Sequence, residues 1–395
     1  MGLLLMVFQL WTQPSVRILG FGREFAGFIP DPITDLIYNP AYLKEIGYGY
    51  DKTFNSLQVY MLTQTLGDTV YLESSISYLF RTGGAHEPLS LLVFYPKLGL
   101  GFRVGAMWRI DERNKHYPEL WLYGQEGFFG ALRIGRYLKI GGEYNFSWNN
   151  QPDEYEIQEW DSLGNQYMGN INHTETSNEL GFGLLIGSGL LQLAISGKKD
   201  WELNSFAVDF WEPQYDITWS DTRGDSRLFL KLQGGVNFLK VVLKCNYREW
   251  LWNRRIYYAP QNLFIDDTVK FSSFKSGVSV LYSPFRDIIV SAAVIYNIEK
   301  FKDGIDYCTK SFIVPVGFER SFGHILKFRF GNTFTFNHTK SFDPYILYPY
   351  IFKYDIYNNV NFGLDLYPYQ RLNFYFATRD PLNYKQWFFG LSFAL

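Results

Sequence analysis

The sequence predicts an all-β protein: a transmembrane antiparallel β-barrel of 14–18 strands, even in number, with an N-terminal plug segment. Aromatic residues make up 19% of the 395 residues, including 36 Phe and 30 Tyr, and these residue types favour strands. Apolar and polar residues alternate with a period of two over segments of about ten to fourteen residues, which are long enough to cross a bilayer when tilted. Short turns alternate with longer polar segments, as in outer-membrane barrels.

Composition excludes several other classes. Charged residues are 19% of the chain, below the roughly 25% of soluble domains. The net charge of −2 gives no global basic field, so we expect no nucleic-acid partner. Two cysteines, Cys245 and Cys308, supply neither a disulfide framework nor a zinc site, and we interpret both as isolated thiols.

The first fifteen residues are apolar from Leu3 to Leu10. No Lys or Arg precedes this core and no Ala-x-Ala cleavage site follows it. We interpret residues 1–15 as a degraded or truncated signal peptide, which favours export.

Residues 28–43, FIPDPITDLIYNPAYL, form a rigid acidic segment ahead of the strands. Asp31 before Pro32, and Asn39 before Pro40, each place a helix-capping residue ahead of a proline at the first helical position. Two very short helices are predicted. The first ends by about Tyr38, because a residue before proline is disfavoured in the α region.

Alternating strands follow. In residues 97–110 an apolar row that contains Phe102 opposes a polar row that contains Arg103 and Arg109. The same division recurs in residues 137–148, 239–248 and 325–337. In residues 180–197 the parity of the apolar residues changes after Gly187–Gly189, which predicts two strands joined by a tight turn and no transmembrane helix.

The connections alternate in length. Tight turns are predicted near residues 96–97, 135–136, 187–189, 238–239, 283–287, 322–324 and 367–370. Longer polar loops are predicted at about residues 111–117, 150–178, 200–225, 251–270, 298–308, 339–350 and 380–385. The strand number is 16 to 18 if Ile46–Asp51 pairs, and 14 if weak runs such as 117–124 and 200–212 belong to loops.

A soluble antiparallel sandwich also alternates apolar and polar residues. Strand length, the density of aromatics on the apolar rows and the final run from Trp387 to Leu395 weigh against a sandwich. In a sandwich, Phe102, Phe328 and Phe334 would lie between two sheets.

A motif in the N-terminal segment carries a family resemblance. Ala26-Gly27, then Asp31, Asp35, Tyr38-Asn39-Pro40-Ala41 and Leu43, resemble the N-terminal signature of FadL-type outer-membrane channels and of the related Por-type barrels of type IX secretion. The resemblance implies a plug inside the barrel. It divides the chain into residues 1–15, a plug or hatch segment at 16–44, and an outer-membrane barrel at 45–395. The ending Gly390-Leu-Ser-Phe-Ala-Leu395 resembles the terminal-strand signal of such barrels.

The polar rows must face the lumen if the apolar rows face lipid. The predicted lumen-lining charged residues are Arg103, Arg109, Lys139, Glu143, Lys231, Lys244, Arg248, Lys327 and Arg329. With Lys240 also in a polar row and with few acids such as Asp365, the interior is predicted to be positive. We expect lumen cations to hold Asp31 and Asp35, and the plug or gate residues are Asp31, Asp35, Tyr38, Asn39 and Pro40. The alternative is that the two aspartates only cap helices.

Residue types that would indicate enzyme chemistry do not cluster. The five histidines have no second ligand at a metal-binding spacing, and the acidic stretch in residues 150–178 lacks the pattern of a calcium loop. We predict no catalytic residues, no metal and no cofactor.

The predicted function is an outer-membrane channel for passive uptake of hydrophobic or amphipathic small molecules. The alternative is a scaffold that docks secreted or envelope proteins. Outer-membrane lipid, lipopolysaccharide, and a hydrophobic solute or secreted protein are the expected partners, and the bacterial outer membrane is the expected location. As a test of which row faces lipid, we expect Phe330→Arg to reduce the stability of the barrel more than Arg329→Gln does.

Overall fold

A computed structural model describes residues 15–44, 58–65, 87–95, 98–111, 119–150, 157–160, 166–188, 190–210, 217–236, 238–258, 263–303, 305–323, 325–342, 350–369, 372–379 and 386–394. Several sequence predictions lie wholly or largely outside these residues: the signal peptide, apart from Ser15, the pairing of Ile46–Asp51, the tight turn at 96–97, the loops at 111–117 and 380–385, and the last residue, Leu395.

Four short helical elements come first in the described chain. They are the α-helices α2 (Val16–Phe21) and α3 (Pro32–Tyr38) and the 3-10 helices η2 (Arg23–Phe25) and η3 (Pro40–Tyr42). Asp31 caps α3, because its carboxylate accepts a hydrogen bond from the amide of Thr34 at 2.8 Å. Asn39 caps η3 through a 2.9 Å bond from the amide of Ala41. The two capped helices and the end of the first at Tyr38 are therefore confirmed, whereas α2 and η2 were not predicted.

All other described elements are strands of one antiparallel sheet. They are β1 (Gln58–Thr65), β2 (Glu87–Tyr95), β3 (Leu100–Asp111), β4 (Glu119–Ile134), β5 (Leu138–Asn150), β6 (Ile157–Trp160), β7 (Gln166–Ser188), β8 (Leu191–Phe210), β9 (Ile217–Val236), β10 (Leu239–Tyr258), β11 (Leu263–Phe285), β12 (Ile288–Asp303), β13 (Ile305–Phe322), β14 (Leu326–Phe342), β15 (Tyr350–Tyr369), β16 (Leu372–Arg379) and β17 (Gln386–Ala394).

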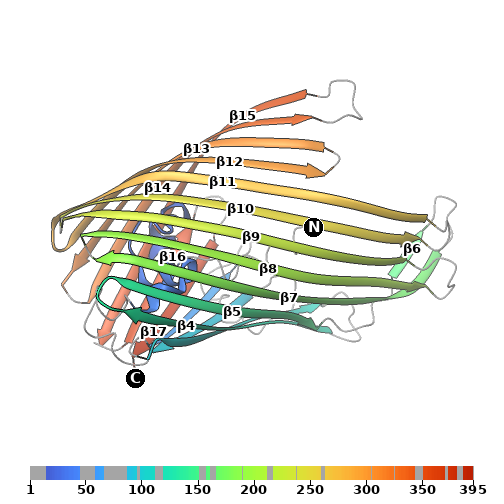
Figure 1. Ribbon diagram of the computed structural model, residues 1–395, viewed down its shortest axis with the longest axis horizontal. Coiled ribbons are helices and arrows are strands. Elements are labelled where there is room, and N and C mark those ends of the chain that lie inside the picture. The colour runs from blue at the N-terminus through green and yellow to red at the C-terminus, as the bar shows by residue number, and fades with distance from the viewer. Residues whose placement is uncertain are drawn as a thin grey trace.

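The sheet closes on itself. Each strand pairs with its neighbour in the chain, except that β5 pairs with β7 and β6 pairs only with β7. The first strand completes the ring, because β1 pairs with both β2 and β17. Among the described residues the ring contains sixteen strands, an even number within the predicted range. Figure 1 shows these strands curving around a common interior.

Several strands are longer than predicted. The strands β7 to β11 run for 20 to 23 residues, and Figure 1 shows them extending far from the end with the tight turns. The loops predicted at residues 150–178, 200–225, 251–270 and 298–308 are therefore largely wrong, because most of these residues pair in the sheet. The outer part of β7 is mostly polar and gives no period-two signal, whereas in β8 the exposed Trp201 and Leu203 do alternate with the buried Asp200 and Glu202.

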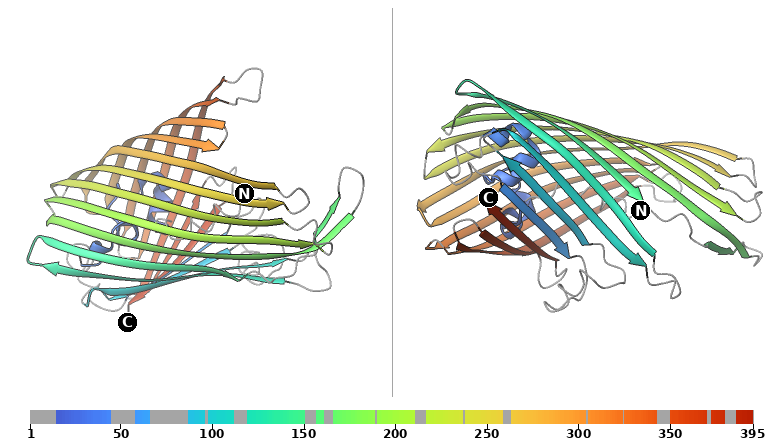
Figure 2. Two further views of the ribbon diagram at one scale, coloured as in Figure 1. Left: turned by 45° about the vertical axis from the view of Figure 1, so that its right-hand side comes forward. Right: turned by 90° about the horizontal axis from the view of Figure 1, so that it is seen from below.

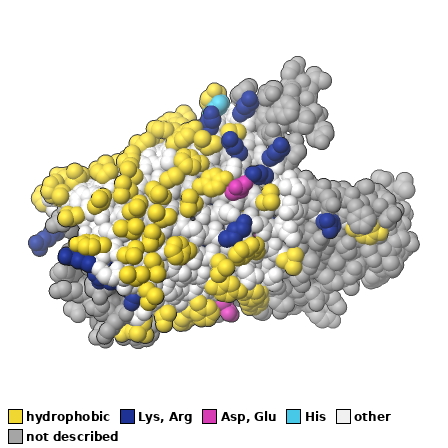
Figure 3. Space-filling model, in the orientation of Figure 1, with side chains coloured by type: hydrophobic (Ala, Val, Ile, Leu, Met, Phe, Trp, Pro, Cys, Tyr) yellow, Lys and Arg dark blue, Asp and Glu magenta, His cyan; other side chains and the backbone are white. Residues whose placement is uncertain are grey.

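The apolar rows face outward, as predicted. Phe102, Phe328 and Phe334 are 40%, 36% and 38% exposed, and no second sheet covers them in the described structure. The neighbouring inward residues Arg103 and Arg329 are buried. Figure 3 shows the resulting hydrophobic band over the outer surface. This arrangement excludes the soluble sandwich.

The N-terminal segment, defined here as residues 15–44, lies inside the ring (Figure 2). Helix α2 contacts strands β13 to β17, and η3 contacts β4, β5 and β7. Each helix that the structure describes is too short or too polar to cross a membrane.

Candidate functional site

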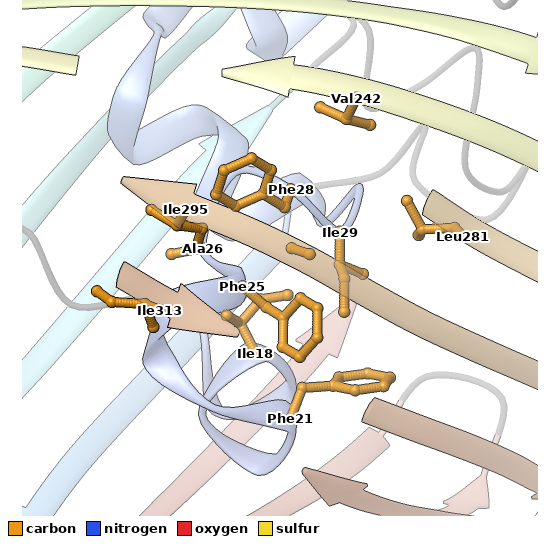
Figure 4. Packing of buried hydrophobic residues seen from close by; sticks show 11 residues of the cluster. Ile18, Phe21, Phe25, Ala26, Phe28, Ile29, Val242, Leu281, Ile295 and Ile313 are labelled. Carbon is orange, nitrogen blue, oxygen red and sulfur yellow. The ribbon is translucent and has the colours of Figure 1, made fainter. Parts of the chain in front are cut away.

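The contact between the N-terminal segment and the inner wall is the candidate functional site. An apolar cluster forms one half of it, in which Ile18, Phe21, Phe25, Ala26, Phe28 and Ile29 pack against Val242, Leu281, Ala293, Ile295 and Ile313. Figure 4 shows the ring of Phe28 and the side chain of Ile29 lying beside strands β10 to β12. The barrel supplies these apolar side chains from inward positions that are otherwise polar, so the wall is adapted to the segment.

Inward-facing glycines let the backbone of the segment approach the wall. A Cβ atom on Gly141 would lie 2.5 Å from the amide nitrogen of Ala41, and one on Gly363 would lie 2.9 Å from the Cα of Gly20. Carbon atoms do not come that close without displacement. Gly183, Gly317 and Gly331 meet the segment in the same way. Only glycine fits at these positions while the segment stays in place.

One of the two acidic plug residues pairs with a lumen cation. Asp35 lies 2.8 Å from the Nζ atom of Lys231, and both side chains are buried. Burial raises the pKa of the Asp35 carboxyl above its ordinary value, and the ammonium group of Lys231 opposes that rise. Lys244 donates a 2.5 Å hydrogen bond to the carbonyl of Ala26 and lies 4.4 Å from the ring centre of Tyr38. Two lumen lysines therefore hold the segment at separate points.

The other acidic residue was predicted to meet a lumen cation, and that prediction is wrong. Asp31 lies 3.9 Å from Arg17, which belongs to the segment itself. Arg17 in turn forms an ion pair with the lumen acid Glu319 at 3.1 Å. Burial lowers the pKa of Arg17, but the carboxylates of Glu319 and Asp31 raise it, and the net shift is upward. The contact at α2 thus has a cation on the segment and an acid on the wall.

This contact continues into a buried ion network. Arg329 donates to Glu319 and, with two nitrogen atoms, to Asp365. Asp365 also accepts a 2.7 Å hydrogen bond from the hydroxyl of Tyr367. A bidentate arginine–carboxylate pair has a defined geometry as well as a favourable energy, so the network fixes Glu319 for its contact with Arg17.

Tyr38 and Asn39 anchor the segment on strands β7 to β9. The Nδ2 atom of Asn39 donates to the backbone carbonyls of Leu184 and Ile195, each at 3.1 Å. The ring of Tyr38 stacks on that of Phe229 at a centroid distance of 5.0 Å. Pro40, the remaining predicted plug residue, is buried in η3.

The other predicted lumen residues divide into three groups. Arg103, Lys139 and Glu143 are buried inside the barrel, where Arg103 donates to Glu143. Arg248 and Lys327 are only partly buried. Arg109 lies in β3, opposite Trp121, but its side chain is outside the described part of the structure.

The predicted positive bias of the lumen is not found among the buried charges of the described strands. The buried cations are Arg103, Lys139, Arg223, Lys231, Lys244 and Arg329, and the buried acids are Glu143, Asp200, Glu202, Asp225, Glu319 and Asp365. Four of these acids lie in segments that the sequence analysis had treated as loops or had not assigned to the lumen. The two signs are balanced because buried charges need partners.

A pocket of about 190 Å³ lies where the segment meets strands β10 to β12, near the tight turns. It is lined by Arg17, Ile29, Pro30, Lys240, Leu281, Ser283 and Ile289. Ile29 and Leu281 also belong to the apolar cluster. The pocket therefore combines an apolar surface with two cationic side chains.

The wall beside the apolar cluster contains a break in strand pairing. Between the pairs Ala292↔Val316 and Ile295↔Ile313, strands β12 and β13 have no paired residues. Pro315 occupies this stretch, and it has no N–H group to donate to a neighbouring strand. Val294 in the same stretch lines an open apolar hollow of about 410 Å³ on the outer face of β9 to β12.

Within the described residues no group of His, Cys, Asp and Glu side chains is arranged to hold a metal ion. Cys245 and Cys308 are free thiols. Part of the acidic stretch in residues 150–178 lies outside the described residues.

No family model matches the chain, and no curated protein matches it. Solved structures do match. The Pseudomonas putida toluene transporter TodX covers 91% of this chain and 91% of its own length, with a TM-score of 0.39 and 11% identity. The monoaromatic hydrocarbon channel CymD covers 98% of each chain, with a TM-score of 0.42 and 12% identity. A bacterial polysaccharide outer-membrane secretin covers 87% of this chain and 99% of its own, with a TM-score of 0.44 and 8% identity.

TodX and CymD are FadL-family channels, the group that the N-terminal motif resembles. Their identities to this chain and their TM-scores are too low to assign its function. The functional proposal therefore depends on the site itself.

Sequence reasoning missed Arg17, Glu319 and the inward glycines of the site. Arg17 lies ahead of the motif, and Glu319 lies outside the segments in which the sequence shows opposed apolar and polar rows. The glycines had a detectable signal, because Gly141 lies in a row with Lys139 and Glu143, which were already assigned to the lumen.

Proposed function

We propose that the protein is an outer-membrane β-barrel channel for passive uptake of hydrophobic or amphipathic small molecules. The N-terminal segment is the plug beside which the solute passes. The barrel is closed, its outer surface is apolar, and its interior holds an apolar cluster next to the segment.

The height of the outer apolar band supports a membrane location. Leu326 and Phe336 are ten residues apart on β14, a distance of about 34 Å along a strand and about 24–28 Å along the membrane normal at a tilt of about 35–45°. Outer-membrane barrels carry an apolar band of about 25 Å. A bacterial outer membrane therefore fits the outward residues of this barrel.

The pocket of about 190 Å³ between the segment and the wall is the observation that carries the channel proposal. An apolar cavity of about 150 Å³ is large enough for benzene. Ile29, Leu281 and Ile289 supply apolar contacts for such a solute, and Arg17 and Lys240 lie where a polar end could be held. The pocket therefore suits a small aromatic or amphipathic compound near the end of the barrel with the tight turns.

The break at Pro315 adds support for a route through this region. It lies beside the apolar cluster on the inside and near the apolar hollow on the outside. Without the ladder hydrogen bonds, strands β12 and β13 can separate there at lower cost than where the ladder is complete.

Filling the pocket tests the proposal. We expect Ser283→Phe to reduce uptake of the hydrophobic dye N-phenylnaphthylamine into proteoliposomes, because Ser283 lines the pocket. Ser273→Phe is the matched control on the same strand, in the same inward row but outside the pocket. Uptake that is equal for the wild type, both variants and protein-free liposomes would overturn the channel proposal.

A docking scaffold for secreted or envelope proteins is the second candidate. The long outer ends of β7 to β11 favour it, because they form a broad paired sheet beyond the apolar band. On β9 and β8, Arg223 pairs with Glu202 at 2.8 Å, which stiffens this sheet. A scaffold would retain an envelope protein in pull-down experiments while passing no dye.

A further inference from the structure

We propose that the outer face of strands β12 to β14 binds the phosphorylated headgroup of an outer-leaflet lipid. The binding residues are the lysine cluster, defined as Lys300, Lys310 and Lys340. This inference rests on the proposed outer-membrane location, and it adds a lipid site that is separate from the solute pocket.

Strand register brings the three lysines together around Cys308. Lys300 on β12 and Lys340 on β14 are both paired with Cys308 of β13, and Lys310 lies two residues further along β13. Neighbouring strands are about 4.8 Å apart and two residues along a strand span about 7 Å. The three backbone positions therefore lie within about 10 Å of one another, and lysine side chains are long enough to converge on one phosphate group.

All three lysines face outward. They are exposed, and they continue the outward rows that contain Tyr296, Phe312 and Phe336. Figure 3 shows Lys and Arg side chains gathered at the edge of the hydrophobic band over the upper strands. These cations therefore face the surroundings of the barrel and not its lumen.

The neighbouring charges leave an excess of cations on this face. Lys270 is already paired with Glu249 at 2.6 Å. Lys302 is exposed and is opposite Asp306 in the register, and His338 is opposite Lys310. Glu299 belongs to the inward row, where it accepts a 2.9 Å hydrogen bond from Asn297. No described acid pairs with Lys300 or Lys310 on the outward row.

The level of the cluster matches that of a lipid headgroup. Lys310 lies two residues beyond Phe312, and Lys340 lies four residues beyond Phe336, on the side away from the tight turns. A cation in a lipid-facing row is costly at the midplane and tolerated near the interface. Acyl chains can then lie along Phe312 and Phe336 while the headgroup phosphate meets the lysines.

This continuity of charge and apolar surface selects a lipid as the ligand. A free phosphate would use the lysines alone, whereas a phosphorylated lipid uses the lysines and the aromatic wall beneath them. Lysine binds phosphate as a point charge and needs no fixed planar geometry, which suits flexible side chains on an exposed face.

The test compares two triple variants in phosphatidylcholine nanodiscs. Lys300→Gln/Lys310→Gln/Lys340→Gln removes the cluster. Arg133→Gln/Arg136→Gln/Arg286→Gln removes the same charge near the tight turns and is the matched control. The probes are bisphosphorylated lipid A, its dephosphorylated form and soluble pyrophosphate. Native mass spectrometry measures how much lipid each protein retains.

We expect the wild type and the control variant to retain bisphosphorylated lipid A, and the cluster variant to retain it about 10- to 100-fold more weakly. Equal retention by the cluster and control variants would overturn the inference. So would equal retention of the dephosphorylated lipid, or displacement by pyrophosphate at the concentration of the lipid.

The same nanodisc samples separate this inference from the proposed function. A wild-type barrel that inserts and passes dye in proteoliposomes but retains no phosphorylated lipid contradicts the lipid site alone. A chain that does not insert into lipid at all contradicts the outer-membrane channel, and the lipid site with it.

Discussion

Gly141 on β5 provides a sharp test of how the N-terminal segment is held. A Cβ atom at this position would lie 2.5 Å from the amide nitrogen of Ala41 and 2.6 Å from the carbonyl carbon of Pro40. Both neighbours are backbone atoms, so no side chain can rotate away. Gly141→Ala therefore forces η3 and the wall apart.

The displacement follows from the geometry. Real Cβ contacts begin at about 3.0–3.4 Å, so η3 must move by about 0.5–0.9 Å. That movement pulls Asn39 away from the carbonyls of Leu184 and Ile195, which it now meets at 3.1 Å. Overpacking of this kind costs about 1–3 kcal/mol. The undocked fraction of the segment should then rise by about 5- to 150-fold.

Limited trypsin digestion measures that fraction, because Arg23 and Lys44 in the segment are cleavage sites. When opening and closing are fast relative to cleavage, the cleavage rate follows the open population. The adjacent outward glycine gives the control, since the atom nearest to a Cβ on Gly142 is 3.8 Å away. Cleavage of Gly141→Ala at the rate of the wild type and of Gly142→Ala would refute a segment docked on inward glycines.

The remaining predictions concern the buried ion pairs and the side of the barrel wall, lipid or lumen, that a residue faces. Asp35→Asn should destabilise the docked segment by about 3–5 kcal/mol because it leaves Lys231 buried without its carboxylate, whereas Asp31→Asn keeps a capping side chain and should cost under about 1 kcal/mol. Trypsin resistance of the two variants checks this, and equal losses would contradict the assignment of Lys231 as the partner of Asp35. Phe330→Arg should cost about 2–4 kcal/mol near the midplane, but Arg329→Gln should cost at least as much, about 3–5 kcal/mol. Urea unfolding in micelles ranks the two, and a small loss for Arg329→Gln would contradict the network with Glu319 and Asp365.

The structure reverses the order of stability losses that the sequence predicted for that last pair, for an identifiable reason. Alternation placed Arg329 in the inward row and Phe330 in the outward row, and both assignments are correct. A row within one strand does not reveal which residues of the neighbouring strands meet it inside the barrel. Glu319 and Asp365 surround Arg329 only after β13, β14 and β15 pair, so the high cost of removing Arg329 could not be derived from its own strand.

The fold itself was largely predictable, because lipid-facing strands require apolar side chains at every second position. The ends of the strands could not be predicted in this way. Beyond the apolar band β7 and β11 contain polar residues such as Asn172 and Asp266, so these segments read as loop from sequence although they lie in strands. The local signal of the plug was also strong at the proline-containing helices, where Asp31 and Asn39 act as caps. It was absent for α2, which is held by Arg17 and by contact with wall glycines.

The balance of buried charge in the described lumen bears on the class of solute. Lys231 is matched by Asp35 of the segment, and Arg329 is matched by Glu319 and Asp365. Each such pair contributes little net field of its own. A route selected by charge would need an excess of one sign along its length, whereas the apolar cluster and the pocket beside Ile29 offer a surface for uncharged or amphipathic molecules. If the protein is the channel proposed above, the ion pairs that hold the segment in place favour hydrophobic solutes over ions.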